Sequence, residues 1–252
     1  MDTALAKLRP FNLVAGLLHL ASFVAILFLA NDAALPVTAT YLTGPPGSGA
    51  YGDPITLFDI NIGYAVAGFL LISAFFHFLI VSPTFFPRYV AGLREHHNTF
   101  RWVEYSLSSS IMIVLILQLN GLANFAALAG LFAVNASMIL FGWLQERYTT
   151  PGDGDLVPFI FGSMVGIVPW LIIAINLAGP GNTSDATVPG FVWGIIVSLF
   201  VFFNAFGVVQ WKQYRAKGKW ADYLRGERTY IVLSLVAKTL LAWQVFSGAL
   251  AS

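Results

Sequence analysis

Residues 230–250, YIVLSLVAKTLLAWQVFSGAL, form a long apolar run that contains a single charged side chain, Lys238. A helix of about 20 mostly apolar residues is long enough to cross the hydrocarbon core of a bilayer. A charged side chain at the centre of such a helix costs about 2.5–3.5 kcal/mol, so it faces the interior of a helix bundle and serves a purpose there. This stretch therefore predicts a membrane helix that carries a functional lysine.

The composition places most of the chain inside a membrane. Of its 252 residues, 58% are hydrophobic and only 10% are charged, and the mean hydropathy is +0.76. A soluble domain of this length needs more charge to cover its surface. The chain has no cysteine, which excludes disulfides, thiolate catalysis and cysteine-ligated metal sites. We expect an all-α membrane protein with no enzymatic activity, no bound metal and no nucleic-acid partner.

Seven segments are long and apolar enough to span a bilayer. The first follows Lys7 and Arg9, but it is long for a signal peptide and lacks a clear cleavage site of small residues, so we interpret it as a retained helix. Turn-forming stretches such as TGPPGSG (43–49) and TTPGDGD (149–155) separate the spans. We predict a single domain, residues 1–252, with spans at about 10–30, 57–81, 98–119, 122–145, 156–178, 189–211 and 229–250.

Lysine and arginine are distributed unequally between the two sides of this predicted bundle. Apart from Lys238, all of them lie at the N-terminus, in the even-numbered connections or at the adjoining helix ends, and the odd-numbered connections have none. The positive-inside rule then predicts a cytoplasmic N-terminus and an extracellular C-terminus in the cell membrane. The twelve residues are Lys7, Arg9, Arg88, Arg94, Arg101, Arg147, Lys212, Arg215, Lys217, Lys219, Arg225 and Arg228.

The first outer connection has the pattern of a β-hairpin. PVTATYLT (36–43) alternates and is rich in β-branched residues, GPPGSG (44–49) is a turn, and AYGDPITLF (50–58) can return beside the first strand. An irregular loop is the alternative. Elsewhere, Asn182-Thr183-Ser184 matches a glycosylation acceptor, although such a short match is weak evidence.

The polar residues within the spans predict one interior cluster. Lys238 lies about nine residues, or about 14 Å, from the start of its predicted span, and Glu104 is the one carboxylate that we expect at depth. Ser108 follows Glu104 by four residues and Ser234 precedes Lys238 by four, so each pair shares a helix face. The remaining polar candidates within the spans are His19, His77 and Ser73.

Two interpretations of Lys238 and Glu104 remain open on this reasoning. The pair can be a structural bridge between the third and seventh helices. Alternatively, Lys238 is a desolvated amine that forms a Schiff base with an aldehyde, and Glu104 supplies the anion that a protonated Schiff base requires. Likewise, His19 and His77 are either hydrogen-bonded packing residues or participants in proton exchange. The basic run KQYRAKGK (212–219) predicts attraction to anionic lipid.

Two motifs resemble the signatures of the heliorhodopsins, a family of retinal proteins. They are RWVEYSLSSSIMI (101–113) on the third span and SLVAKTLLAW (234–243) on the seventh. The similarity extends over essentially the whole chain, including the inverted orientation. It implies a seven-helix light sensor with a slow photocycle, no net ion pumping, all-trans retinal as chromophore, and a homodimer that carries a β-hairpin in the first outer loop.

The resemblance also implies roles for individual residues. Lys238 would hold retinal as a protonated Schiff base, Glu104 would be the counterion, and Ser108 and Ser234 would hydrogen-bond near them. His19, His77 and Ser73 would line the adjacent polar cavity. The positions expected around the chromophore are Tyr105, Met112, Asn135, Met138, Trp170 and Phe203. A signalling partner is expected at the cytoplasmic face.

Two alternatives use the same lysine differently. A light-driven proton pump or channel of the microbial rhodopsin type usually has an aspartate four residues before the lysine, where this chain has Ser234. It also has a second carboxylate eleven residues after the counterion, where this chain has Leu115. A transporter or channel without a chromophore would use Lys238 and Glu104 as a gate, and it would remain colourless when retinal is supplied.

Overall fold

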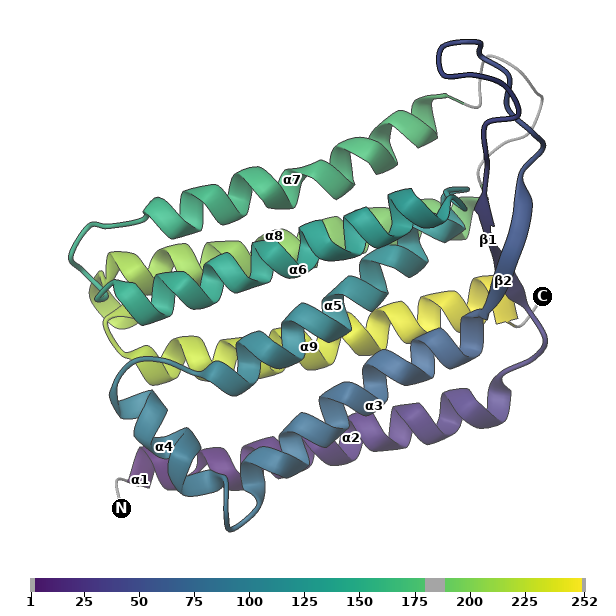
Figure 1. Ribbon diagram of the computed structural model, residues 1–252. Coiled ribbons are helices and arrows are strands. Elements are labelled where there is room, and N and C mark those ends of the chain that lie inside the picture. Colours follow the sequence, from purple (N-terminus) through teal and green to yellow (C-terminus); the bar gives the residue numbers. More distant parts are fainter. Residues whose placement is uncertain (1–2, 180–188, 251–252) are drawn as a thin grey trace.

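Seven helices in the computed structural model, which describes residues 3–179 and 189–250, are long and apolar enough to cross a membrane (Figure 1). Together with a two-stranded sheet they form a rhodopsin-like bundle, as predicted. The seven are α2 (Leu8–Leu29), α3 (Ile62–Val81), α5 (Thr99–Leu119), α6 (Phe125–Tyr148), α7 (Val157–Ala178), α8 (Gly190–Arg215) and α9 (Tyr223–Val245). The tripeptide 182–184 lies outside the described residues.

Asparagine and aspartate residues set the starts of several helices. Asn61, Asn98 and Asn124 accept hydrogen bonds from backbone amides three residues later, at the beginnings of α3, α5 and α6. Asp222 accepts one from Leu224 N at the beginning of α9. These side chains satisfy amides that the first helical turn leaves without a partner. The chain therefore encodes its helix starts locally, at the boundaries between loops and apolar runs.

Two span starts differ from the prediction by five and six residues. The second span was expected from residue 57, but residues 57–61 belong to a strand and α3 begins at Ile62. The seventh was expected from residue 229, but α9 begins at Tyr223. A hydropathy pattern identifies apolar, lipid-facing residues. The first turn of α9 is polar and packs against other helices, so the pattern did not include it in the span. A short π-helix, η3 (Phe246–Leu250), follows α9.

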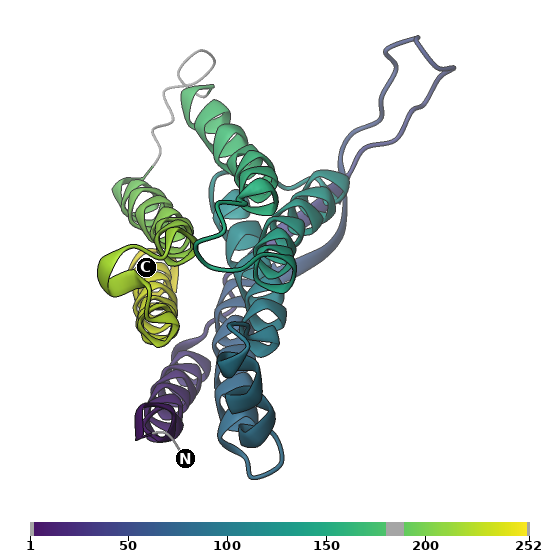
Figure 2. The same cartoon turned by 90° about the vertical axis from the view of Figure 1, so that its left-hand side faces the viewer.

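The predicted hairpin is present between α2 and α3. Strands β1 (Ala34–Ala39) and β2 (Ile55–Asn61) pair antiparallel, with an irregularity between Val37 and Thr38. Thr38 N also donates to Ala123 O in the α5–α6 connection, which joins the hairpin to the end of the bundle. Figure 2 shows the tip of the hairpin extending beyond the helices.

One loop contains an unexpected helix. The stretch 82–97 was predicted as a connection, but Phe86–Arg94 form α4, which lies beside the short N-terminal helix α1 (Thr3–Ala6) in Figure 1. Its buried face, which includes Tyr89 and Leu93, packs against Leu5 and Leu8 and against Tyr223 of α9. A 3₁₀ turn, η2 (Gly218–Trp220), connects α8 to α9. Thus α4 covers the N-terminal end of the bundle, and the hairpin lies at the other end (Figure 1).

Candidate functional site

Lys238 and Glu104 form a buried ion pair at the centre of the bundle. Lys238 Nζ lies 2.6 Å from Glu104 Oε1, and the two side chains are only 4% and 7% exposed. Glu104 lies in the second turn of α5, whereas Lys238 lies in the middle of α9, 15 residues from its first residue. The two residues singled out by the sequence therefore meet directly.

Ser73, Ser234 and Tyr105 contact the pair directly. Ser73 from α3 donates to Glu104 Oε1 at 2.7 Å, and Lys238 Nζ donates to Ser234 Oγ at 2.9 Å. The ring of Tyr105 lies beneath the ammonium, with its centroid 5.0 Å from Nζ, so the aromatic face adds a cation–π contact. Ser108 is completely buried, and its hydroxyl has no partner among the described residues. The ammonium is thus held by one anion, one hydroxyl and one ring.

The two histidines lie beside each other near this pair. Their rings stack at a centroid distance of 5.5 Å, and His77 Nδ1 lies 2.8 Å from Asn12 Oδ1. Asn12 Nδ2 donates to Leu8 O, which assigns Oδ1 as the atom that faces His77. His77 Nδ1 must then carry the proton in the neutral ring, which leaves Nε2 as an acceptor. Both nitrogens of His19 are buried without a partner among the described residues.

A large cavity begins at Lys238 and extends between α5, α6, α7 and α8. Its volume is about 610 Å³, within the range of about 300–1,000 Å³ that is typical of small-molecule sites. Tyr105, Met112, Met138, Trp170 and Phe203 line it, as do Ser108 and Ser234. Trp170 makes edge contacts with Phe200 and Phe203. Five of the six residues expected around a chromophore are therefore wall residues of one cavity.

The sixth, Asn135, is not a wall residue of this cavity. Its side-chain amide donates to Ser109 Oγ at 2.9 Å and to Ser110 Oγ at 3.1 Å, so Asn135 joins α6 to α5. Ser109 lines the cavity. Asn135 thus contributes to the position of a wall residue.

The cavity suits a long apolar aldehyde such as retinal. Its walls are mainly aromatic and aliphatic, and Lys238, Ser234 and Ser108 are among its few polar wall residues. A Schiff base requires one amine at the end of an apolar slot and one anion beside that amine. Lys238 and Glu104 supply both, and the unpartnered hydroxyl of Ser108 lies in the same wall. The residues present therefore fit the group.

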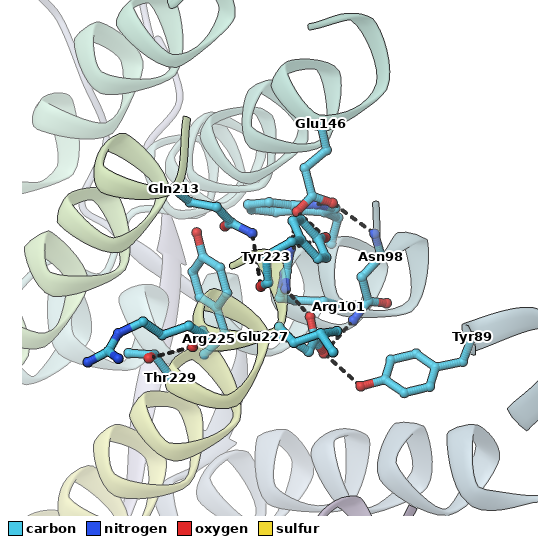
Figure 3. Close-up of polar contacts among 12 residues, drawn as sticks. Tyr89, Asn98, Arg101, Glu146, Gln213, Tyr223, Arg225, Glu227 and Thr229 are labelled. Carbon is cyan, nitrogen blue, oxygen red and sulfur yellow. Dashed lines mark hydrogen bonds and ion pairs between the residues drawn. The ribbon is translucent and has the colours of Figure 1, made fainter. Parts of the chain in front are cut away.

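A second ionic cluster lies toward the N-terminal end of the bundle (Figure 3). The Arg101 guanidinium forms ion pairs with Glu146 of α6 and Glu227 of α9, and both carboxylates are almost completely buried. Trp102 Nε1 donates to Glu146 Oε2 at 2.5 Å, and Tyr223 OH donates to Glu146 Oε1 at 2.9 Å. Arg101 also lies over the ring of Tyr230, 4.1 Å from its centroid. This cluster ties three helices together.

The cluster corrects two expectations. Glu104 was expected to be the one deep carboxylate, but Glu146 and Glu227 are also buried. Arg101 was counted with the twelve basic residues on one side of the bundle, yet it is only 5% exposed, so eleven of the twelve face solvent at least in part. Both acids escaped notice because the predicted spans ended at 145 and began at 229. The sequence signal for these acids was Arg101, one helical turn before Glu104, because a buried arginine requires anions near it.

Comparisons with known proteins agree with this geometry. The family model described as heliorhodopsin matches residues 8–250. Among solved structures, one described as the crystal structure of thermophilic rhodopsin matches with a TM-score of 0.65 and 14% sequence identity, covering 100% of this chain and 95% of that chain. No curated protein matches this chain.

The solved structure shows a shared fold, and the family model identifies the group of proteins. The match covers all seven membrane helices, both buried ionic clusters and the cavity. The family and the rhodopsin fold make this a multi-pass membrane protein of the retinal photoreceptor type. The chain belongs to the heliorhodopsin family.

Proposed function

We propose that this protein is a light sensor in which Lys238 holds all-trans retinal as a protonated Schiff base, with a slow photocycle and no net ion transport. The observation that carries the proposal is the ion pair of Lys238 and Glu104, 2.6 Å apart, at one wall of an aromatic cavity of about 610 Å³. A purely structural bridge gives no reason for a large cavity beside the lysine.

Each residue near the lysine has a defined task in this proposal. Retinal, when bound, supplies visible absorption and light-driven isomerisation. Glu104 holds the proton at Lys238 Nζ in the dark by charge, and Ser73 keeps the Glu104 carboxylate oriented through its hydrogen bond. In the retinal-free protein Ser234 accepts a second hydrogen bond from the same nitrogen; a protonated Schiff base has one N–H, for which Ser234 lies within reach beside Glu104. The aromatic walls exclude water, which strengthens the ion pair.

After illumination, the proton of Lys238 Nζ moves into the polar cluster that contains the histidines. His77 is the first candidate acceptor, because Asn12 fixes Nδ1 as the protonated nitrogen and leaves Nε2 available. His19 stacks on His77 and completes the cluster. This change of charge beside α2 and α3 is the signal that is transmitted to the rest of the molecule.

The distribution of buried acids supports sensing over pumping. Glu104, Glu146 and Glu227 all lie between Lys238 and the N-terminal end of the bundle. Toward the hairpin end, none of the described residues is a buried aspartate or glutamate. A vectorial pump needs proton-exchanging groups on both sides of the Schiff base. Glu146 and Glu227 still keep a pump or channel as the second candidate, because they add acids that a proton path could use.

A spectrum with a matched set of variants tests the proposal. The chain, expressed with all-trans retinal, should show a visible band that Lys238→Ala abolishes and Glu104→Gln shifts to the red. A protein that stays colourless would favour the chromophore-free transporter. Vesicles containing the protein should show no sustained light-driven pH change; sustained proton movement would instead support the pump or channel. Arg228→Ala, an exposed change on the same helix, is the control and should leave the band unchanged.

The proposal includes a membrane orientation and partners. The eleven solvent-facing basic residues support a cytoplasmic N-terminus, where they meet anionic lipid and a soluble signalling partner.

A homodimer is supported by exposed apolar side chains on the hairpin, including Tyr41, Tyr51 and Phe58. Because the chain lacks cysteine, Phe58→Cys offers a single cross-linking site. Oxidation should give a covalent dimer, and a protein that remains monomeric at every concentration would contradict this part.

A further inference from the structure

We propose that Glu227 is the final resting place of the proton that leaves Lys238, and that its protonation loosens α4. This inference rests on the proposed function and names a group that takes part in it. It concerns a carboxylate of α9 that lies outside the Lys238–Glu104 pair and the retinal cavity.

The first argument is the count of charges in the second cluster. Two buried carboxylates, those of Glu146 and Glu227, share the single guanidinium of Arg101. The cluster therefore holds one negative charge in excess of its positive charge, in a region from which water is largely excluded. Unpaired buried charge is costly, and a proton is the smallest group that can neutralise it. Such a cluster is a natural acceptor for a proton released nearby.

The second argument is a direct connection to the Lys238 site. A small cavity of about 30 Å³ has both Glu104 and Glu227 in its wall, together with His77, Ser73 and Arg101. This volume is sufficient for a water molecule, and the wall offers more than the two to four polar partners that an ordered water needs. Glu146 is not one of its wall residues. Of the two acids, Glu227 is therefore the one that a proton can reach.

Two buried donors in the wall of this cavity support an ordered water there. The Nε of Arg101 and the hydroxyl of Tyr230 have no hydrogen-bond partner among the described residues. Buried polar groups nearly always have a partner, in many cases a water molecule. A water in this position would accept from these donors and link the Glu104 side of the cavity to Glu227.

Protonation of Glu227 would change its contacts with α4 and α5. Oε1 accepts from Tyr89 OH and from Asn98 Nδ2, both at 2.9 Å, and Oε2 accepts from Arg101 (Figure 3). Arg101 and Asn98 present only N–H donors to Glu227, so neither can accept a hydrogen bond from its protonated carboxyl group. Burial and the neighbouring Glu227 carboxylate raise the pKa of Tyr89 well above its ordinary value, so Tyr89 remains a hydroxyl donor.

A chain of hydrogen bonds links the same group to the histidines. His77 Nδ1 donates to Asn12, Asn12 Nδ2 lies 3.4 Å from Tyr89 OH, and Tyr89 donates to Glu227. In the proposed step the N–H bond at Lys238 Nζ breaks and an O–H bond forms at Glu227. The nitrogen and the carboxylate both become neutral, so no other reactant is required. Tyr89 then faces a neutral acceptor in place of a charged one, so the hydrogen bond between α4 and α9 is weakened.

Light-minus-dark infrared spectroscopy of the retinal-bound protein in lipid tests the proton site. A positive carboxylic-acid C=O band should appear when the Schiff base loses its proton. The band should be lost in Glu227→Gln, move in frequency in Glu227→Asp, and persist in Glu146→Gln. A band that persists unchanged in Glu227→Gln would overturn the proposal. A normal visible photocycle without any such band would overturn it as well, while leaving the light-sensing function intact.

Hydrogen–deuterium exchange in the dark tests the link to α4 without light or retinal. In the retinal-free protein, amides of residues 86–94 should exchange roughly tenfold faster in Glu227→Gln than in the unmodified chain. That factor corresponds to about 1.4 kcal/mol of lost hydrogen bonding. Tyr89→Phe should produce a similar increase, and Glu95→Gln, an exposed change at the end of α4, should produce none. Unchanged exchange in both Glu227→Gln and Tyr89→Phe would refute the link, even if the protein bound no retinal.

Discussion

Removing either member of the Lys238–Glu104 pair should destabilise the retinal-free protein far more than removing both. At 2.6 Å, the attraction between the two charges is about 6 kcal/mol at an effective dielectric constant of about 20. Much of this is offset by the cost of taking both groups out of water. Breaking a buried pair from one side typically costs about 3–5 kcal/mol, because the remaining charge stays buried without its partner. We expect that range for Lys238→Met and for Glu104→Gln.

The double variant gives the decisive comparison. Lys238→Met combined with Glu104→Gln leaves no charge at the site, so the double variant should lose only about 1 kcal/mol of its free energy of unfolding. Two single losses of about 3–5 kcal/mol each then correspond to a coupling of about 5–9 kcal/mol. Unfolding of the retinal-free proteins in mixed detergent micelles, followed by far-ultraviolet circular dichroism, measures all four. Arg228→Met, an exposed change on α9, should cost less than about 0.5 kcal/mol. Strictly additive single changes, each below 1 kcal/mol, would refute a tightly paired, desolvated lysine.

Three further predictions concern the cavity, the second cluster and the orientation. Gly207 lines the cavity, and a Cβ there would meet only Phe159 at 4.0 Å. Gly207→Leu should therefore slow the growth of the visible band on retinal addition, while it stabilises retinal-free α8 by up to about 1 kcal/mol. Full uptake of retinal at the original rate would contradict the position of the cavity. Arg101→Met leaves two buried carboxylates unpaired and should lower the unfolding free energy by at least about 3 kcal/mol. Arg101→Lys should cost less because it keeps the charge, although it loses the two-pronged hydrogen bonding of the guanidinium. A smaller loss for Arg101→Met than for Arg101→Lys would rule out charge pairing as the cause. In this cysteine-free chain, Thr43→Cys at the hairpin should react with an impermeant maleimide on intact cells and Lys217→Cys only after lysis; the opposite pattern would reverse the proposed topology.

The primary structure was sufficient to predict the seven spans, the hairpin and the Lys238–Glu104 pair. Hydropathy identifies long apolar runs, and a lone lysine within one of them needs an anion. Glu104 was the one acid expected at depth, so it was assigned as the partner of Lys238. The starts of α3 and α9 were harder. Residues 57–61 are apolar enough for a span, but pairing with β1 places them in a strand. Such pairing depends on a partner segment that local composition does not reveal.

The second cluster shows where composition alone is insufficient. Glu146 and Glu227 lie at the ends of helices, where charged residues usually face water. Glu227 is covered in part by α4, which lies at the N-terminal end of the bundle and contributes Tyr89, and Glu146 by Arg101, Trp102 and Tyr223. Phe86–Arg94 also contain a proline and lie between two spans, so the stretch looks like a loop. Only the packing of several elements turns these terminal residues into an interior network.

The seventh membrane helix, α9, supplies a charged side chain to each buried cluster. During synthesis, Arg101 can meet Glu146 as soon as α6 follows α5 into the membrane. At that stage the partner available to Glu104 is the neutral hydroxyl of Ser73 from α3, because its cation, Lys238, belongs to α9. Until α9 docks, α5 carries an uncompensated carboxylate, and α9 itself brings an ammonium that is costly in lipid. Mutual neutralisation therefore favours the arrival of α9 beside α5, so the pair that would hold the chromophore also drives completion of the bundle.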